Sequence, residues 1–377
     1  MKRTKGFGLL GVIVIMLITA VVSSAATGII MLNNTSVASN NSDLIVDEDL
    51  KEFIEIYKTL TSKYYEGINK EELLNAAKKG MSEYLGDKYT TFLGDSEYEK
   101  MLEELSGKYD GIGIRIQNNK IISVTLNSPA YKAGLIKDDE IVSINGFNVE
   151  GMDANFIGNY IKNDGSKTVN LEIKRSNKIM NFAIQKETLP TITYYKIDNT
   201  DIGYLYIENF SEDLSIQVSK ALGELEKEKI KSLIIDVRDN VGGYLSAAEA
   251  TTSLFLEKGK VIYSLRSNNK EFTYNDKTTE KRDYPIVVLI NGGSASAAEI
   301  LAAALKESYG ATLIGTKSYG KGKVQQVIDS FKFTSAEWLT PSGKCIDGIG
   351  LTPDYKIEYA DFENYDSQMI KAIELLK

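Results

Sequence analysis

The chain has 377 residues, a length typical of two or three domains, and its 43% hydrophobic and 25% charged residues match an ordinary globular protein. Its net charge of −8 argues against a nucleic-acid backbone as the main partner. The single cysteine, Cys345, cannot form an intramolecular disulfide, and a chain without histidine cannot build a zinc cluster of cysteine and histidine ligands. We therefore expect neither a metal site nor a nucleic-acid partner.

The N-terminal end of the chain is predicted to anchor it in a membrane. Lys2, Arg3 and Lys5 are followed by Gly6–Leu32, a stretch without a charged residue. The apolar core of a cleaved signal peptide spans about 7–15 residues, whereas crossing a bilayer takes about 20, so this length favours a retained anchor. The positive-inside rule places the basic start in the cytoplasm and the rest of the chain outside. Cleavage after the small residues Ser23–Ala26, which would give a secreted protein, is the alternative.

A polar linker and two helices are expected after the anchor. Asn33–Ser42 is rich in asparagine, serine and threonine, which is typical of a solvated linker. Leu50, Phe53 and Ile54 then begin an apolar pattern that predicts an amphipathic helix. A second helix is expected to begin near Asn69, which precedes two early glutamates in the manner of a helix N-cap.

A small module rich in strands is predicted to follow. Gly111–Ile114 opens it, and a short helix is expected from Ser128 to about Gly134. Asn145–Gly146 is a strong signal for a hairpin turn. The strands predicted from apolar runs are Ile121–Val124, Glu140–Ile144, Val169–Lys174 and Met180–Gln185.

The rest of the chain alternates strands and helices, which predicts an α/β layer with largely parallel strands. In such sheets, active sites lie beyond the carboxyl ends of the strands. Two segments stand just past predicted strand ends, Gly242–Gly243 and Ser296. The predicted strands are Ile202–Ile207, Ser232–Val237, Ile286–Ile290 and Thr312–Ile314, and the predicted helices are Leu214–Glu226, Ala247–Phe255 and Ala297–Ser308.

Ser296 is the first candidate for chemistry, and it has two interpretations. With Glu299 it fits the S-x-x-E capping box at the start of a helix. A helix N-terminus also stabilises developing negative charge through its backbone N–H groups and its dipole, so the same position suits a serine nucleophile. Ser294 is an alternative nucleophile by chemistry alone.

Lys321 is the candidate base, because the chain has no histidine that could take the serine proton. Burial among apolar groups would lower its pKa from about 10.4, and a neutral amine can accept that proton and later return it. Since Lys321 stands between two glycines, a surface turn with an exposed charge is the alternative. Gln325, four residues on, could orient the amine or be a polar residue on an exposed strand.

Gly242 and Gly243 could form a tight turn that presents backbone N–H groups beside Ser296. Together with the N–H group of Ala297, such a turn would form an oxyanion hole. A plain strand-to-helix turn is the alternative, since glycine pairs are common there.

Several motifs, in one order along the chain, give it a resemblance to the C-terminal processing peptidases, the tail-specific Ser/Lys proteases of peptidase family S41. The resemblance covers nearly everything after residue 50. Tyr109–Ile114 and Ser128–Gly134 resemble the family's PDZ domain. The segments that resemble its protease motifs are Ile234–Gly243, Asn291–Ile300, Thr316–Val324, Thr340–Gly343 and Gly350–Asp354.

The resemblance implies a serine endopeptidase that needs neither ATP nor a metal. It assigns the nucleophile to the second serine of the S-A-S run, Ser296, and the general base to Lys321. Gln325 would be the third member of the catalytic group. The backbone N–H groups of Gly242 and Ala297 would stabilise the oxyanion.

The resemblance also implies a substrate class. The glycine-rich loop of a PDZ domain offers backbone N–H groups that capture a C-terminal carboxylate, and a strand edge can pair with the tail. Proteins with exposed C-terminal tails, cut at or near those tails, are therefore the expected partners. The implied peptide-binding residues are Gly111, Ile112, Gly113 and Ile114.

The chain departs from the family pattern at two places. Val241 replaces the usual proline before Gly242, and Ile161–Asn163 reads Ile-Lys-Asn where the family's PDZ domain usually has Ile-Arg-Gly. In some members a PDZ arginine couples ligand binding to the active site. A catalytically silent PDZ scaffold and a partner-activated signalling protease are the alternative functions.

The complete prediction is an α/β (α+β) protease core with an inserted PDZ domain, an N-terminal helical segment and an N-terminal transmembrane anchor. We expect a single-pass protein of a bacterial cell membrane with its catalytic domain outside the cytoplasm. The apolar face of the C-terminal helix, Ser367–Leu376, is expected at the contact of a homodimer. The predicted regions are 1–32 for the cytoplasmic tip and anchor, 33–46 for the linker, 47–104 for the N-terminal helices, 105–188 for the PDZ domain, 189–358 for the protease core and 359–377 for the C-terminal helix.

Overall fold

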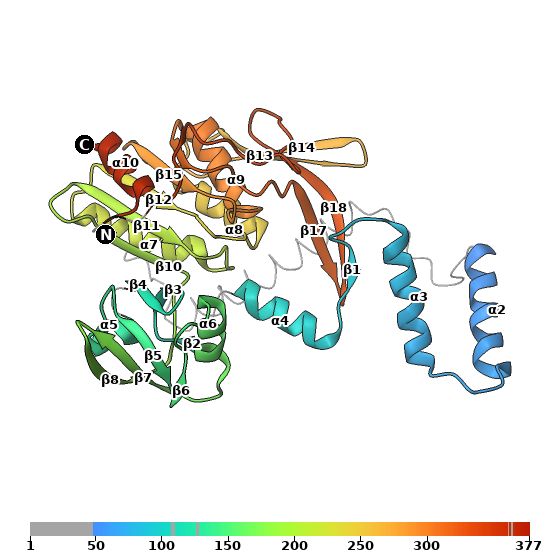
Figure 1. Ribbon diagram of the computed structural model, residues 1–377. Coiled ribbons are helices and arrows are strands. Elements are labelled where there is room, and N and C mark those ends of the chain that lie inside the picture. Colours follow the sequence, from blue (N-terminus) through green and yellow to red (C-terminus); the bar gives the residue numbers. More distant parts are fainter. Residues whose placement is uncertain (1–47, 107–109, 126–127, 361, 363–364) are drawn as a thin grey trace, which may run out of the picture. The chain divides into compact units, whose positions relative to one another are not determined.

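The computed structural model divides the chain into two compact units, residues 1–76 and 77–377. The predicted anchor and linker lie outside the residues that the structure describes. Across the described part of the chain, no helix combines the length and the apolar character that crossing a membrane requires. The described residues are 48–106, 110–125, 128–360, 362 and 365–377 (Figure 1).

The first unit contains helix α2 (Glu48–Lys63) and the beginning of helix α3 (Lys70–Tyr84). Asn69 caps α3 as predicted, because its side-chain oxygen accepts a hydrogen bond from the Glu71 N–H group at 3.0 Å. Apolar side chains of α2 remain exposed, Ile56 by 52%. An amphipathic helix gains most of its stability from covering such a face.

A β-rich module with its own core follows in the second unit. Its main sheet runs in the order β3-β4-β5-β7-β8, with β6 beside β5, so β3 lies at one edge. Ile121, Ile141 and Ile173 are fully buried in its core. Its strands are β2 (Asp110–Gly111), β3 (Ile114–Gln117), β4 (Lys120–Val124), β5 (Glu140–Ile144), β6 (Phe147–Asn148), β7 (Thr168–Arg175), β8 (Lys178–Gln185) and β9 (Glu187–Thr188), and its helices are α5 (Pro129–Ala133) and α6 (Ala154–Asn163).

The turns of this module follow from its sequence, whereas helix α6 does not. Asn145 and Gly146 both have positive φ, 50° and 82°, as the predicted hairpin turn requires. Gly134 ends α5 with a φ of 88°, which suits a helix C-cap. Helix α6 contains a glycine and several asparagines, which are poor helix formers, and burial of Ile157 and Ile161 stabilises it instead.

The central sheet of the second unit contains the predicted parallel strands. Its order is β10-β11-β12-β15-β16-β19, and every neighbouring pair except β10–β11 is parallel. Strands β11, β12 and β15 are buried along their whole length, as expected for strands covered on both faces. The strands are β10 (Ile192–Lys196), β11 (Ile202–Ile207), β12 (Ser232–Asp236), β15 (Ile286–Ile290), β16 (Thr312–Gly315) and β19 (Tyr355–Lys356).

Helices cover both faces of this sheet (Figure 1). Leu205, Ile235 and Val288 project from one face into a core that three helices complete. Those helices are α7 (Leu214–Lys227), α8 (Leu245–Thr252) and α9 (Ala297–Ala304), the last continuing as a π-helical turn, η1 (Leu305–Tyr309). The Ala-rich sequence of α9 lets it lie buried on all sides.

Most of the apolar face of the C-terminal helix α10 (Ser367–Leu376) is covered within the chain, while Ile370 and Leu375 stay exposed, and its predicted homodimer contact stays a prediction. That face packs against the opposite face of the central sheet, beside Ile234 and Leu289. The buried side chains of α10 in this contact are Met369, Ala372 and Ile373.

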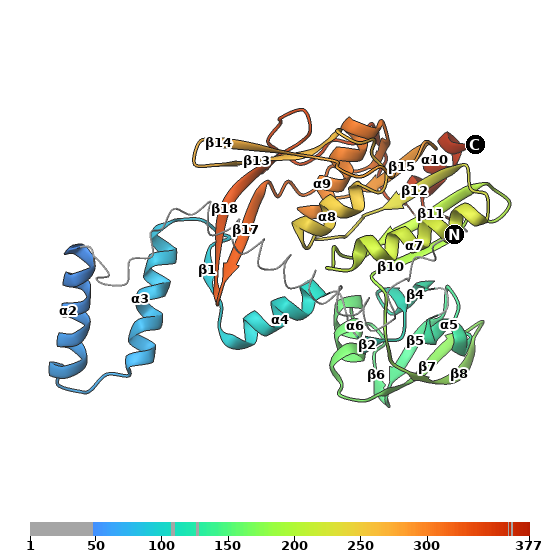
Figure 2. The same cartoon turned by 180° about the vertical axis from the view of Figure 1, so that it is seen from behind.

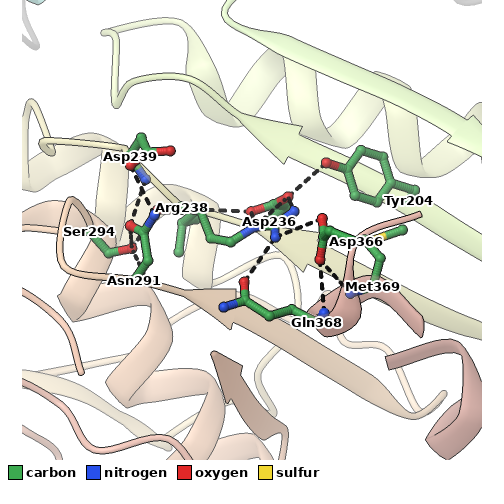
Figure 3. A network of polar contacts seen from close by, with 10 residues as sticks. Tyr204, Asp236, Arg238, Asp239, Asn291, Ser294, Asp366, Gln368 and Met369 are labelled. Atoms are coloured by element: carbon green, nitrogen blue, oxygen red, sulfur yellow. Dashed lines mark hydrogen bonds and ion pairs between the residues drawn. The ribbon is translucent and has the colours of Figure 1, made fainter. Parts of the chain in front are cut away.

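A buried ion pair fixes α10 to the carboxyl end of β12 (Figure 3). Asp236 is fully buried and accepts a hydrogen bond from Arg238 Nη2 at 2.6 Å, while Arg238 Nη1 donates to Asp366, the N-cap of α10, at 2.9 Å. Burial alone would raise the pKa of Asp236, but the charge and hydrogen bonds of Arg238 outweigh it and hold that pKa below its usual value. The end of β12 is thereby fixed close to the loops that follow it.

A second sheet carries the long hairpin β17–β18, and its strands are absent from the predicted set because they are half-buried and lack clear alternation. β18 also pairs with β1 and β13, so segments far apart in sequence meet here (Figure 2). Thr90 accepts a hydrogen bond from the Thr334 N–H group at 3.1 Å. The elements are β1 (Thr91–Phe92), β13 (Val261–Ser267), β14 (Lys270–Asn275), β17 (Lys323–Ile328) and β18 (Phe331–Leu339), and helix α4 (Asp95–Ser106) follows β1.

Candidate active site

Ser296 lies at a sharp turn between β15 and α9. Its φ and ψ are 56° and −118°, a region that costs a non-glycine residue about 1–3 kcal/mol. Ala295 and Ala297 are buried on either side, whereas Ser296 is only half-buried, so the turn presents this side chain. A strained strand-to-helix turn that carries a serine has the geometry of a nucleophile elbow.

The alternative nucleophile, Ser294, is fully buried and holds the turn (Figure 3). Its hydroxyl donates to the Val237 carbonyl at 2.7 Å and accepts from the Asn291 N–H group at 3.0 Å. The side chain of Asn291 in turn donates to Asp239 Oδ1 and accepts from the Asp239 N–H group, both at 2.9 Å. These bonds join the loop after β12 to the loop before α9, and they hold Ser296 in its strained conformation.

The loop after β12 contacts the serine turn through Gly242, which has a φ of 104°. A Cβ at this position would lie 2.9 Å from the Cβ of Ser296 and 3.0 Å from the backbone nitrogen of Ala297, so only glycine fits. The Ala295 N–H group also donates to the Asn240 carbonyl at 2.9 Å. The backbone of the loop after β12 is therefore in direct contact with the backbone around Ser296.

The N–H group of Gly242, which was expected to face an oxyanion, donates instead to Asn240 Oδ1 at 2.8 Å. Asn240 is fully buried, and its Nδ2 donates to the Ile207 carbonyl at 2.8 Å. The role of Gly242 as an oxyanion donor stays a prediction. The N–H group of Ala297 lies in the first turn of α9, where backbone donors have no intrahelical acceptor.

Lys321 does not lie on a free surface turn. Its N–H group donates to Glu299 Oε2 at 2.9 Å, and its carbonyl accepts from the Trp338 indole at 2.8 Å. Gly320 is packed so closely that a Cβ there would lie 2.6 Å from the backbone nitrogen of Gly350. The backbone on both sides of the lysine is therefore fixed by tertiary contacts.

The Lys321 side chain is half-buried, and its Nζ lies 5.4 Å from the centre of the Tyr89 ring. Burial lowers the pKa of this amine, the positive charge of Lys332 lowers it further, and the negative charge of Glu299 acts in the opposite direction. The resulting pKa lies below the usual lysine value, which is the direction that a general base requires. Sequence reasoning missed Tyr89, because no local pattern connects it to Lys321.

Glu299 joins the serine and lysine segments. It is fully buried in the first turn of α9, and its Oε2 accepts from the N–H groups of Ser296 and Lys321, both at 2.9 Å. Its Oε1 accepts from the Gly320 N–H group at 2.8 Å and from the Ser318 hydroxyl. The capping contact predicted between Ser296 and Glu299 is present, but it is one of four contacts. The sequence signalled the cap alone.

Gln325 lies on β17, in the hairpin that follows Lys321. Its side chain is half-buried, and its Nε2 lies 3.5 Å from Thr334 Oγ1, a long hydrogen bond across the hairpin. The predicted role of Gln325 in orienting the Lys321 amine stays a prediction.

The predicted peptide-binding loop leads into β3, the terminal strand of its sheet. A Cβ on Gly113, whose φ is 83°, would lie 2.3 Å from the Cβ of Ser128, so this loop needs glycine. The Ile112 carbonyl accepts from the Ala130 N–H group at 2.8 Å. An extended peptide can add to the edge of a terminal strand through its main chain.

Three family descriptions match the chain. Peptidase family S41 matches residues 201–357, which contain the serine and lysine segments, and a PDZ domain matches residues 120–175. The N-terminal domain of the activating protease CtpB matches residues 13–97. The β-rich module is therefore a PDZ domain, and the central sheet belongs to the peptidase domain.

Related proteins of the same peptidase family are similar to this chain over most of its length. The carboxy-terminal processing proteases CtpB and CtpA of Bacillus subtilis (strain 168) are each 35% identical to it, over 86% and 87% of this chain and 71% and 73% of their own lengths. Among solved structures, the photosystem II D1 C-terminal processing protease superposes with a TM-score of 0.51 at 25% identity, covering 81% of this chain and 86% of that one. The chain belongs to peptidase family S41, among the carboxy-terminal processing proteases.

Proposed function

We propose that this chain is an ATP-independent serine endopeptidase that cleaves proteins at or near exposed C-terminal tails, with Ser296 as nucleophile and Lys321 as general base. The observation that carries the proposal is a shared carboxylate: the N–H groups of Ser296 and Lys321 donate to one oxygen of Glu299. The strained turn at Ser296 and the lowered pKa of Lys321 support the chemistry. Membership among the carboxy-terminal processing proteases supports the substrate class.

The reaction proceeds by acyl transfer. The neutral amine of Lys321 takes the proton of the Ser296 hydroxyl as Oγ attacks the scissile carbonyl carbon. The resulting ammonium then donates that proton to the leaving amine, and the peptide bond breaks to leave an acyl-enzyme. Water then attacks the ester while the neutral amine of Lys321 takes a proton from it. The ammonium donates that proton to Ser296 Oγ as the ester bond breaks, which restores the Ser296 hydroxyl and the neutral Lys321.

Backbone N–H groups stabilise the tetrahedral oxyanion in this proposal. The N–H group of Ala297, at the positive end of α9, is one donor. Gly242 supplies the second, which requires its N–H group to leave Asn240 Oδ1 and turn toward Ser296. Glycine adopts positive and negative φ about equally readily, so residue 242 is suited to such a rotation. In the same proposal, Gln325 on β17 orients the Lys321 amine.

Substrate recognition uses the PDZ domain. The loop Gly111–Ile114 captures the terminal carboxylate, and the tail adds to the edge of β3 as a further strand. The protein acts at a bacterial cell membrane, with the uncharged stretch Gly6–Leu32 as its anchor and the catalytic domain outside the cytoplasm. A second copy of the chain would pack on α10, where Ile370 and Leu375 are exposed.

Cleavage of an unfolded reporter protein by the full chain in detergent micelles tests this function. We expect fragments cut near the reporter's C-terminus, identified by mass spectrometry, and a loss of about 10⁴-fold or more in kcat for Ser296→Ala and for Lys321→Ala. Lys323→Ala, two residues further along the chain at the start of β17, is the matched control and should cleave at the normal rate. Amidation of the reporter's C-terminus should raise KM, because the PDZ loop loses its carboxylate.

Each alternative function has its own outcome in this assay. Cleavage that survives Ser296→Ala contradicts the mechanism. Tail binding by the unmodified chain without any cleavage favours the PDZ scaffold. Cleavage that begins only on addition of a partner protein favours the partner-activated protease, with the same catalytic residues.

A further inference from the structure

Glu299 is a carboxylate with 0% of its surface exposed, close to the start of α9. Burying an isolated carboxylate is costly, so the group must be satisfied by its surroundings. Four donors converge on it: the N–H groups of Ser296, Gly320 and Lys321, and the Ser318 hydroxyl. Two of these donors come from the residues to which the proposed function assigns catalysis.

The four hydrogen-bond donors around Glu299 require a side chain that only accepts hydrogen bonds. An ionised glutamate only accepts hydrogen bonds, whereas a protonated glutamate or a glutamine carries a donor of its own. The three backbone N–H groups are fixed by the main chain and cannot turn into acceptors. A glutamine at position 299 would therefore set its amide N–H against a backbone N–H and push the segments apart.

A helix cap alone does not account for this arrangement. A capping box explains the bond between the Ser296 N–H group and Glu299 Oε2. The donors of residues 318–321 lie outside α9, in the connection between β16 and β17, and add nothing to the helix start. Their convergence on one carboxylate instead fixes the spacing between two segments that only the tertiary fold brings together.

We propose that Glu299 is a positioning residue that holds the nucleophile turn of Ser296 against the backbone of Lys321; the proposal rests on the Ser296–Lys321 mechanism above. Its negative charge also acts on the lysine amine. The charged and aromatic groups that act on that amine are Glu299 from α9, Lys332 from β18 and the ring of Tyr89. Since the negative charge of Glu299 raises the pKa of Lys321, its neutralisation should lower that pKa further.

The test compares Glu299→Gln with Glu307→Gln in the full chain. Glu307 lies in η1 and accepts from the Ser342 N–H group at 2.8 Å on the surface, so it is a matched control for the chemical change. We expect kcat of Glu299→Gln to fall about 100-fold with KM changed less than threefold, because small misplacements of catalytic groups cost that much. The rise of kcat/KM with pH should also move to lower pH, and Glu307→Gln should match the unmodified enzyme in both.

The variant Glu299→Asp distinguishes the effect of the negative charge from the effect of the side-chain length. It keeps the negative charge but withdraws the carboxylate by one methylene, so kcat should stay reduced while the pH profile returns toward that of the unmodified enzyme. Active-site titration counts the folded enzyme in each sample. A normal kcat per folded molecule in Glu299→Asp, or an unshifted pH profile in folded Glu299→Gln, overturns the proposal. If Glu299→Gln does not fold, the kcat of Glu299→Asp decides alone.

The outcomes also separate this proposal from the proposed function. If Ser296→Ala abolishes cleavage while Glu299→Gln behaves like Glu307→Gln, only the positioning role fails. If Ser296→Ala cleaves normally, the catalytic assignment itself fails, whatever Glu299→Gln does.

Discussion

Two helices of this protein begin with a serine beside a positive-φ glycine, and the two sites differ in what the backbone does. In the PDZ domain, Ser128 has φ and ψ of −70° and 166°, and its hydroxyl accepts from the Tyr131 N–H group at 3.2 Å as an ordinary N-cap. In the peptidase domain, Ser296 has φ and ψ of 56° and −118°. Gly113 packs on the first serine and Gly242 on the second.

The difference shows that the strained backbone conformation is at Ser296 and that neighbouring segments maintain it. Ser128 satisfies the helix start with its side chain and keeps an ordinary extended backbone, so its conformation carries no strain. At Ser296 the buried Glu299 accepts a hydrogen bond from the N–H group of Ser296 itself, and the serine side chain is half-buried at the turn. A residue in a sparsely populated conformation persists only when its surroundings fix it, and such residues cluster at functional sites.

Substitution of the two glycines should give the largest contrast. Gly242→Ala places a Cβ 2.9 Å from the Cβ of Ser296, so kcat on a short peptide should fall about 10²–10³-fold as the oxyanion donors move. Gly113→Ala should destabilise the PDZ domain by more than about 1 kcal/mol with that kcat unchanged. Steady-state kinetics and thermal unfolding of both variants check this pair. A normal kcat for Gly242→Ala would contradict the proposed role of this loop in stabilising the oxyanion.

The pH dependence should arise from the serine site alone. Since the pKa of Lys321 lies below 10.5, kcat/KM should rise about tenfold per pH unit at low pH and become constant above a midpoint that lies below 10.5. Lys332→Gln removes a positive charge that lowers the pKa of Lys321, so the midpoint should move to higher pH. A pH–rate series with both enzymes measures this, and a kcat/KM that does not rise with pH anywhere below 10.5 would argue against a lysine base.

Removal of the ordinary cap should affect stability and leave the chemistry intact. Ser128→Ala deletes the acceptor for the Tyr131 N–H group, so the free energy of unfolding should fall by about 1 kcal/mol. Its kcat on a short peptide should equal that of the unmodified enzyme. Denaturant unfolding measures the change in stability, and the peptide assay measures kcat. A large loss of kcat would mean that Ser128 affects the reaction.

The smallest expected effect concerns the aromatic ring over the lysine. Tyr89→Leu keeps an apolar cover but removes the attraction between the ring and the Lys321 ammonium, worth about 0.5–1 kcal/mol at an exposed site. The pKa of Lys321 should fall slightly, and kcat/KM below the midpoint should rise about two- to fivefold. Lys78 lies 5.8 Å from the Phe92 ring, so Phe92→Leu is the matched control and should leave the pH profile in place.

Much of the fold was predictable because its determinants are local. The apolar runs that became β11, β12 and β15 and the turn at Asn145–Gly146 depend on residues within short windows. Helix α6 and the hairpin β17–β18 were not predictable, since weak helix formers and half-buried strands are stabilised by contacts from other segments. The C-terminal helix was recognised, but its docking face on the central sheet was not.

The sequence by itself determined which residues are candidates for catalysis, because Ser296 and Lys321 stand in motifs whose order and flanking small residues are readable along the chain. Only the tertiary structure decided how they are held. The contacts of Glu299 with Ser318, Gly320 and Lys321 and the Tyr89 ring over Lys321 join segments that lie far apart in the sequence. Such contacts follow from the order and pairing of strands, which no short window of sequence specifies.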